Sequence, residues 1–300
     1  MKVQILGAGA VGACFGGQLA RIGHDVTCFA RGANLAAIRE RGLEIRTPEG
    51  TLHARVTATD RFEALPPAEF AILAVKSYSL SDIVPAVRHC AEQGTPVVSL
   101  LNGVETVERL EQAGVPKAAI IGGIAKVSAV RLGPGVVERR SPFQSVVVGE
   151  LDGRMSDRVE RIAAAFRDAG VDARGSDRIV VELWDKFIFI ASVAAACGLA
   201  RSPIGPLRAN PLGPRLLKRA VEEAVAVGRA RGVLLSDDAS ARALSAIETL
   251  PPGTKPSFLV DLEAGGPTEL EILSGAVSRL AEAVGVPTPV HDTATAALAR

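Results

Sequence analysis

A glycine-rich hexapeptide near the N-terminus has the spacing of a dinucleotide-binding turn. Its residues are Gly7, Ala8, Gly9, Ala10, Val11 and Gly12. In such a turn one glycine permits the tight bend, the second lets the backbone approach a pyrophosphate, and the third lets helix and strand pack closely. The phosphates then lie at the positive N-terminal end of the helix. These glycines could also simply close a strand–helix turn, but the apolar run before them and the helical pattern after them favour dinucleotide binding.

The end of the second predicted strand indicates which dinucleotide is bound. Residues 28–32 read CFARG, without the acidic side chain that would hold a ribose 2′-hydroxyl, and Asp25 lies at the opposite end of the strand. Arg31 instead offers a planar guanidinium suited to a 2′-phosphate. The alternative is a solvated surface arginine. We predict NADP as the cofactor.

Three further residues could do chemistry. Lys76 and Asn102 each follow a predicted strand, where ligands of open α/β sheets bind, although they could equally be a solvated loop lysine and part of an Asn-Gly turn. Lys186 is the last charge before the apolar stretch 187–200. An ammonium at the edge of a desolvated region gives up its proton more readily, which suits a general acid. The alternative is a structural lysine paired with Glu182 one turn earlier.

The N-terminal half must supply the sheet that positions these residues. Strands are predicted over residues 3–6, 25–29, 70–75, 96–100 and 118–121, and helices over residues 10–22, 34–41, 81–92, 104–113 and 154–169. Strands that are apolar throughout and alternate with helices predict a mostly parallel, doubly wound α/β sheet, the Rossmann type. Residues 43–59 and 124–150 interrupt the alternation and are predicted to be hairpins or extra strands.

After about residue 176 the pattern becomes purely helical. Helices are predicted over residues 179–199 and 215–231, the second with Lys218, Arg219, Glu222 and Glu223 facing solvent. Ser236 is predicted to cap a third helix, and the TELE sequence at 268–271 to open a fourth as a capping box. We therefore predict an NADP-binding Rossmann domain over residues 1–176 and an all-α substrate and catalytic domain over residues 177–300.

Composition excludes several classes of protein. With 300 residues, 48% hydrophobic, 22% charged and a net charge of +1, the chain has neither the polarity of a disordered protein nor the charge excess typical of nucleic-acid or membrane-surface binding. Its four cysteines and four histidines are scattered, so neither a disulfide framework nor a metal site is predicted. The first twenty residues also look like a secretory leader, but their glycine spacing favours a folded unit. We expect a cytoplasmic chain without a membrane span.

The motifs together resemble those of the ketopantoate reductase (2-dehydropantoate 2-reductase) family. In chain order they are residues 7–12 with Arg31, LAVK at 73–76, LNG at 101–103, WDK at 184–186, and Ser257-x-x-x-Asp261 with Glu269. The resemblance spans essentially the whole chain. It implies a Rossmann domain followed by a helical domain, an active site in the cleft between them, NADPH-dependent reduction of a 2-keto acid, and a place in pantothenate biosynthesis.

The resemblance also implies a role for each matching residue. Lys186 would be the general acid and Glu269 its partner; Asn102, Ser257 and Asp261 would bind substrate; residues 7–12, Arg31, Lys76 and Asn102 would contact the cofactor. The chain departs from the family where the asparagines four and eight residues after the lysine are replaced by Ile190 and Ala194. Because buried amides discriminate strongly for polar substrates, we expect either 2-dehydropantoate or a related, less polar branched 2-keto acid.

Two other functions are compatible with parts of the sequence. One is another Rossmann-plus-helical enzyme, such as a hydroxyacid or opine-type dehydrogenase, against which Ser257, Asp261 and Glu269 argue. The other is a non-catalytic NADP-binding sensor, which tight NADPH binding without turnover would reveal. A small-molecule 2-keto acid is the expected partner, with no nucleic acid and no membrane. A monomer and a homodimer are both compatible with the sequence.

Overall fold

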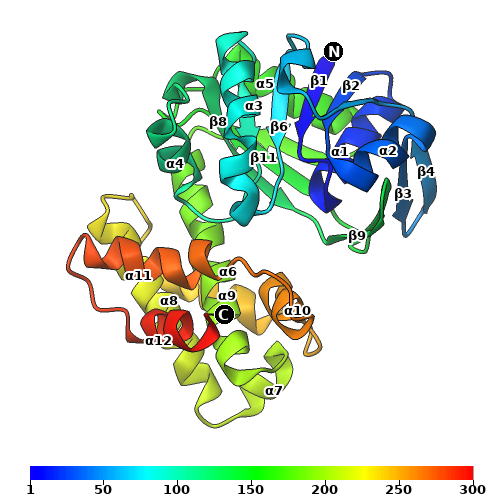
Figure 1. Ribbon diagram of the computed structural model, residues 1–300. Helices are drawn as coiled ribbons and strands as arrows, with labels where there is room; N and C mark the ends of the chain where they lie inside the picture. Colours follow the sequence, from blue (N-terminus) through cyan, green and yellow to red (C-terminus); the bar gives the residue numbers. More distant parts are fainter. Residues whose placement is uncertain (300) are drawn as a thin grey trace. The chain divides into compact units, whose positions relative to one another are not determined.

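The computed structural model describes residues 1–299 and divides the chain into two compact units (Figure 1). The sheet unit comprises Met1–Leu101 and Thr106–Ile179. The helical unit comprises Val180–Arg300 together with the short segment Asn102–Glu105. Within residues 1–299, no helix is both long and apolar enough to cross a bilayer.

The sheet unit is built on an eight-stranded sheet in the order β12-β11-β8-β7-β6-β1-β2-β5. Its strands are β1 (Lys2–Leu6), β2 (Asp25–Phe29), β5 (Thr57–Thr59), β6 (Phe70–Leu73), β7 (Val97–Ser99), β8 (Ile120–Lys126), β11 (Ser145–Gly149) and β12 (Asp172–Gly175). Neighbouring strands are parallel except β8 and β11, which pair antiparallel. The predicted mostly parallel sheet is therefore confirmed.

Helices cover both faces of this sheet because its strands are apolar on both sides. They are α1 (Ala10–Arg21), α2 (Gly32–Arg41), α3 (Leu80–Glu92), α4 (Thr106–Gln112) and α5 (Asp157–Asp168), with short 3-10 turns η1 (Phe62–Ala64), η2 (Ser77–Ser79) and η3 (Lys117–Ala119). Ile5 of β1 packs in one core with residues of α1 and α5. Its neighbour Leu6 packs in a second core with residues of α3 and α4. This alternation is the doubly wound arrangement predicted from the sequence.

The two irregular stretches form extra strands, as predicted. Most of them build a second, four-stranded sheet in the order β4-β3-β10-β9, made of β3 (Leu43–Thr47), β4 (Gly50–Ala54), β9 (Ala129–Gly133) and β10 (Val136–Arg139). This small sheet packs on α1. Strand β12, at the edge of the large sheet, was not predicted, because its sequence DARG carries a single buried apolar side chain.

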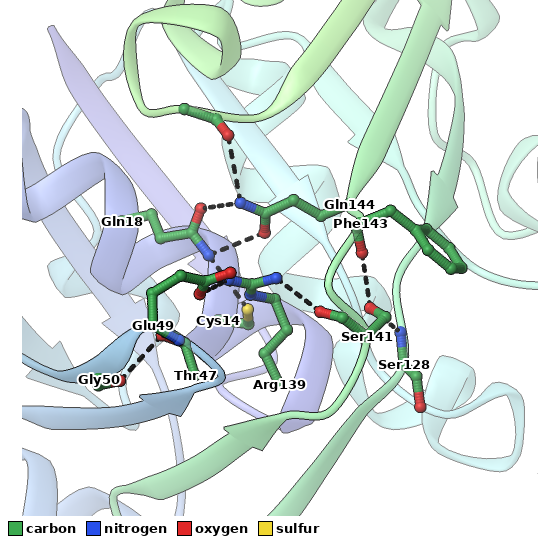
Figure 2. A network of polar contacts seen from close by, with 11 residues as sticks. Cys14, Gln18, Thr47, Glu49, Gly50, Ser128, Arg139, Ser141, Phe143 and Gln144 are labelled. Carbon is green, nitrogen blue, oxygen red and sulfur yellow. Dashed lines mark hydrogen bonds and ion pairs between the residues drawn. The ribbon is translucent and has the colours of Figure 1, made fainter.

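A pair of side-chain amides, buried at Gln18 and half-buried at Gln144, links α1 to the chain beyond the small sheet (Figure 2). Gln18 and Gln144 each donate an Nε2 hydrogen bond to the other's Oε1 at 2.9 Å. Gln18 also donates to the Cys14 sulfur at 3.3 Å, and Gln144 to the carbonyl of Gly170. Burial raises the pKa of the Cys14 thiol to about 11, so this cysteine stays protonated at neutral pH.

Arg139 and Glu49 are an ion pair drawn in the same network (Figure 2). The Arg139 guanidinium, almost fully buried, donates to the carboxylate of Glu49 in the β3–β4 turn and, at 2.6 Å, to the carbonyl of Ser141. The Ser141 hydroxyl in turn donates to the carbonyl of Phe143 at 2.6 Å. The Arg139–Glu49 contact joins the β9–β10 hairpin to the β3–β4 hairpin. The small sheet that they form packs against α1, the helix that follows the glycine-rich turn.

The helical unit contains α6 (Ile179–Ala200), α7 (Ile204–Ala209), α8 (Gly213–Ala230), α9 (Ala239–Glu248), α10 (Ser257–Glu263), the 3-10 turn η4 (Leu270–Ile272), α11 (Ser274–Glu282) and α12 (Pro289–Leu298). Helix α6 lies among the others (Figure 1), and its residues from Trp184 to Cys197 supply much of their common core. Trp184 and Phe187 meet edge-to-face at 5.5 Å. The prediction of an all-α second unit is confirmed over the described residues, and Arg300 lies outside them.

Three local predictions in this unit were wrong. Ser236 does not cap a helix: α9 begins at Ala239, and the Ser236 hydroxyl bonds the carboxylate of Asp238 instead. The TELE sequence does not open an α-helix as a capping box. It leads into η4, whose N-cap residue Glu269 makes no side-chain cap bond, and the Glu271 carboxylate pairs with Arg279.

Glu223 was predicted to face solvent but is buried. Its carboxylate accepts hydrogen bonds from the backbone N–H groups of Val290 and His291 at 3.0–3.1 Å. These groups are in the first turn of α12, which has no partner for them within the helix. Glu223 therefore caps α12 from a neighbouring helix, an arrangement that periodicity within α8 alone does not reveal.

Candidate functional site

The glycine-rich turn joins β1 to α1, and two of its glycines have no room for a side chain. Gly7 has φ +104°, and a Cβ there would lie 2.5 Å from Val75 Cγ1. A Cβ at Gly12 would overlap the carbonyl oxygen of Gly7. Gly9 is the N-cap residue of α1, which has no side-chain cap and no acidic residue in its first turn. The N-terminus of α1 thus has the bare, positively polarised geometry that an anion requires.

Arg31 lies at the same edge of the sheet as this turn. Leu6 and Phe29 are register partners at the carboxyl ends of the parallel strands β1 and β2, and Arg31 follows two residues later. Its guanidinium lies 5.6 Å from the centre of the Phe29 ring and donates to the carbonyl of Asp82 at 3.1 Å. The side chain is 58% exposed, so it can reach a ligand at this edge.

Lys76 follows β6, which is the neighbour of β1 on the other side from β2 in the sheet. It is exposed and accepts a backbone hydrogen bond from Ser79 at 2.9 Å that closes the turn η2. The preceding residues Ala74 and Val75 contact the position of Gly7. The loop carrying Lys76 therefore adjoins the glycine-rich turn.

Asn34 is a supporting residue that the sequence reasoning missed. Its amide donates to the carbonyl of Ala8 at 2.9 Å and accepts from the N–H of Gly135 at 2.8 Å. Gly135 forms the β9–β10 turn at φ +73°. Asn34 thus holds the glycine-rich turn, α2 and the small sheet together. Its only sequence signal is a position two residues into α2, which does not distinguish it from a helix-surface asparagine.

Asn102 and Glu269 meet in the helical unit, although 167 positions separate them in the sequence. Asn102 lies in the segment Asn102–Glu105, which follows β7, and Glu269 immediately precedes η4. The Asn102 amide donates to Glu269 Oε2 at 3.4 Å. Glu269 is only 5% exposed, a rare degree of burial for a carboxylate. Of the predicted substrate-site residues, the structure brings these two into direct contact.

Lys186 lies on the partly accessible stripe of α6. Glu182, Lys186 and Ile190 succeed one another at i, i+4 spacing and are all half-buried, whereas Ala194, one turn further, is 2% exposed. Phe187 and Ile188 point into the apolar core beside this stripe. Beyond Lys186, the stripe presents only hydrocarbon.

Ser257 and Asp261 lie one turn apart on α10. Ser257 is exposed at the first position of this helix, and Asp261 is half-buried. Phe258, Leu259 and Leu262 of the same helix pack into the core that α6 and η4 share. Helix α10 is therefore fixed against the elements that carry Lys186 and Glu269.

The two units together define a class of protein. A large parallel sheet with a bare glycine-rich turn, joined to a helical unit that holds a buried carboxylate against an asparagine, is the architecture of a nucleotide-dependent oxidoreductase. The family models of ketopantoate reductase PanE/ApbA and of its C-terminal domain match residues 3–153 and 178–300. The chain belongs to the ketopantoate reductase family, and it is accordingly an NAD(P)-dependent oxidoreductase acting on a CH–OH group.

Individual relatives agree with this assignment. The chain is 32% identical to a 2-dehydropantoate 2-reductase of Halobacterium salinarum, over 98% of this chain and 96% of the relative. A PanE/ApbA family ketopantoate reductase from Ralstonia eutropha is similar in structure with a TM-score of 0.89 and 30% identity, covering 99% and 97% of the two chains. A D-mandelate dehydrogenase in complex with NADH has a TM-score of 0.85 and 25% identity, covering 99% and 97%.

Proposed function

We propose that this protein reduces a 2-keto acid to the 2-hydroxy acid with NADPH, and that Lys186 is the general acid. The substrate is 2-dehydropantoate or a related branched 2-keto acid. The observation that carries the proposal is the contact between Asn102 and Glu269, because it joins polar groups from two distant segments of the sequence and one of them is a buried carboxylate. A cytoplasmic location and a homodimer remain predictions.

The residues of the sheet unit fit a dinucleotide. Gly7 and Gly12 stand where a Cβ would clash with neighbouring protein atoms, so the turn keeps its tight backbone, and the first turn of α1 carries neither a side-chain cap nor an acid. The pyrophosphate would lie against this helix end, Arg31 would hold the 2′-phosphate, and Lys76 would face the cofactor from the neighbouring loop. When bound, NADPH supplies the hydride. The NADH complex of the related D-mandelate dehydrogenase makes the choice between NADPH and NADH a point to test.

The residues of the helical unit would then stabilise the charge that develops on the substrate and orient the substrate. Reduction of a keto carbon leaves negative charge on the carbonyl oxygen, which the Lys186 ammonium stabilises and protonates. Glu269, held by Asn102, provides a fixed negative partner for that ammonium. Ser257 and Asp261 on α10 orient the substrate through hydrogen bonds. Each role follows the family's pattern position by position.

The side chain of the substrate meets hydrocarbon rather than amides. Ile190 and Ala194 continue the stripe of α6 that carries Lys186. An apolar wall gives no hydrogen bond to a hydroxylated side chain and leaves that hydroxyl's lost hydration uncompensated. A branched or aryl 2-keto acid without the hydroxyl therefore fits this wall better than 2-dehydropantoate. The relationship to D-mandelate dehydrogenase supports the same inference.

The test is a steady-state assay of NADPH oxidation with 2-dehydropantoate, 3-methyl-2-oxobutanoate and phenylglyoxylate. We expect kcat/KM for one of the two apolar acids to exceed that for 2-dehydropantoate by about tenfold, the selectivity of one to two lost buried hydrogen bonds. Ile190→Asn should reverse this ratio toward the hydroxylated acid, and Val180→Asn, an exposed position of the same helix, should leave it unchanged.

Two results would contradict the proposal. A strong preference of the unaltered protein for 2-dehydropantoate over both apolar acids would refute the apolar wall as a specificity determinant. Tight NADPH binding with no oxidation across the whole panel would refute reductase activity and favour a sensor.

A further inference from the structure

Arg279 of α11 and Glu105 form an ion pair with two hydrogen bonds, which we call the clasp. Arg279 Nε donates to Glu105 Oε1 at 3.0 Å, and Nη2 donates to Oε2 at 2.7 Å. The Glu105 side chain is 10% exposed and that of Arg279 is 43% exposed. The hydrogen bonds that Arg279 donates to the Glu105 carboxylate raise the pKa of the guanidinium above its usual value. A two-point pair with one buried partner is geometrically specific, unlike a typical surface ion pair.

The same guanidinium also holds η4. Arg279 Nη2 donates to the carbonyl oxygen of Glu271 at 3.0 Å, and Nη1 contacts the Glu271 carboxylate at 3.3 Å. Glu271 is two residues after Glu269, and Glu105 is three residues after Asn102. Arg279 therefore ties together the two short segments whose other ends carry Asn102 and Glu269.

Backbone packing brings the two segments close at a third point. Gly103 has φ +91°, and a Cβ there would lie 3.1 Å from the carbonyl oxygen of Ile272 and 3.3 Å from its Cβ. Val104 packs against the apolar core that contains Ile272. A glycine in the left-handed region lets the segment approach η4 this closely. The approach of the two segments is set by backbone and apolar packing, and the Glu105–Arg279 pair adds a polar link between the same two segments.

We propose that the Glu105–Arg279 ion pair is a positioning device for the reaction, which fixes the segment Asn102–Glu105 so that the Asn102 amide stays against Glu269. Neither Glu105 nor Arg279 touches the reacting atoms in this account. The proposal rests on the proposed function, because it gives Asn102 and Glu269 a part in reduction. It assigns a positioning role in catalysis to a two-point ion pair, with one buried partner, outside the predicted site residues.

The test is a double-mutant cycle between the clasp and the residue through which it acts. Glu105→Gln should lower kcat about tenfold in the otherwise unaltered enzyme, a modest cost for misplacing one active-site group. In the Asn102→Ala background the same change should lower kcat by less than about twofold, because the amide to be positioned is gone. Arg279→Lys, which keeps the charge and loses the two-point geometry, should repeat the pattern if Glu105→Gln folds poorly.

The controls separate positioning from stability and from the function itself. Glu222→Gln breaks an exposed ion pair with Lys218 in the same unit and should leave kcat unchanged. A purely structural clasp would lower the melting temperature but change kcat by the same factor in both backgrounds, and that result would overturn the inference alone. If Asn102→Ala itself retained full kcat, both the proposed role of Asn102 and the positioning role of Glu105 and Arg279 would be refuted. The proposed reductase function would still hold in that case, provided that Lys186→Ala lost turnover.

Discussion

At the residue scale, the proposed chemistry depends on a few side chains whose surroundings differ sharply. Arg31 is exposed at the carboxyl edge of the sheet and contacts Phe29 and Asp82. Glu269 is buried and bonded to Asn102. An exposed arginine can rearrange to meet a charged ligand, whereas a buried carboxylate keeps one position. The first suits cofactor selection and the second suits a fixed charge near the reaction.

Arg31 provides a direct test of the cofactor proposal. Arg31→Ala removes the guanidinium proposed to contact the 2′-phosphate, so KM for NADPH should rise about tenfold or more, the cost of a charge-assisted contact, while KM for NADH changes little. Arg41→Ala removes an equally exposed arginine at the end of α2 and should change neither value. Equal changes in KM for NADPH and NADH would show that Arg31 does not read the 2′-phosphate.

Some of these residues could be predicted from the sequence, and others could not. Arg31, Lys186 and the glycines stand in motifs with local spacing, so a linear pattern suffices to find them. Asn34 and the pair Glu105 and Arg279 do not, since their roles come from contacts across 101 and 174 positions respectively. No periodicity records a contact of that kind.

At the element scale, α12 is held by groups that titrate. His291 is fully buried, with Nε2 3.0 Å from the carbonyl oxygen of Ala220 and Nδ1 3.3 Å from Ser274 Oγ. A carbonyl can only accept, so Nε2 carries the proton and Nδ1 accepts from the serine. Burial lowers the pKa of His291 from 6.5 to about 4, and the hydrogen bond to the Ala220 carbonyl and the charge of Asp292 oppose this shift. The ring is therefore neutral in the folded protein at neutral pH.

This buried histidine predicts a pH dependence of stability. Between pH 6.5 and about 4 the unfolded chain binds a proton at His291 that the folded chain does not, so the free energy of unfolding falls as the pH is lowered through this window. The total loss in the free energy of unfolding from His291 across this window is roughly 3 kcal/mol. It is complete below pH 4 and absent above pH 6.5.

Urea unfolding at several pH values measures this effect. His291→Gln cannot titrate, so its free energy of unfolding should fall less steeply with decreasing pH than that of the unaltered protein, by up to one proton in the slope. Glu223 and the other carboxylates titrate in both proteins and cancel in the comparison. Parallel curves for the two proteins would contradict the buried, neutral state of His291.

Elements with strong local patterns were predictable, and those defined by distant contacts were not. The parallel strands are visible in the sequence as continuous apolar runs, and α6 is visible as a long apolar helix. β12 has one buried apolar residue and exists because β11 supplies its partner. The fourth predicted helix begins later than its capping-box sequence indicates, since Glu269 and Glu271 are engaged by Asn102 and Arg279. Tertiary bonds there outweigh the local cap.

At the scale of the whole molecule, the fold and its class follow from the order of motifs along the chain. The glycine-rich turn and Arg31 lie in the sheet unit, and Lys186, Glu269, Ser257 and Asp261 lie in the helical unit. The short segment Asn102–Glu105, which follows a strand of the sheet unit, groups with the helical unit. A single linear boundary near residue 176 does not describe such a segment, because compactness in space and order in sequence differ there.

The mechanism that we propose for this reductase is that the cofactor held by the sheet unit delivers hydride while Lys186 of the helical unit delivers the proton. Its most direct test is a single-turnover experiment in which the enzyme–NADPH complex is mixed with the best 2-keto acid and NADPH absorbance is followed. Lys186→Ala should slow this turnover by about 100-fold or more, the usual contribution of a general acid, with NADPH affinity changed less than about twofold. A Lys186→Ala protein that binds NADPH and turns over at nearly the unaltered rate would contradict the claim.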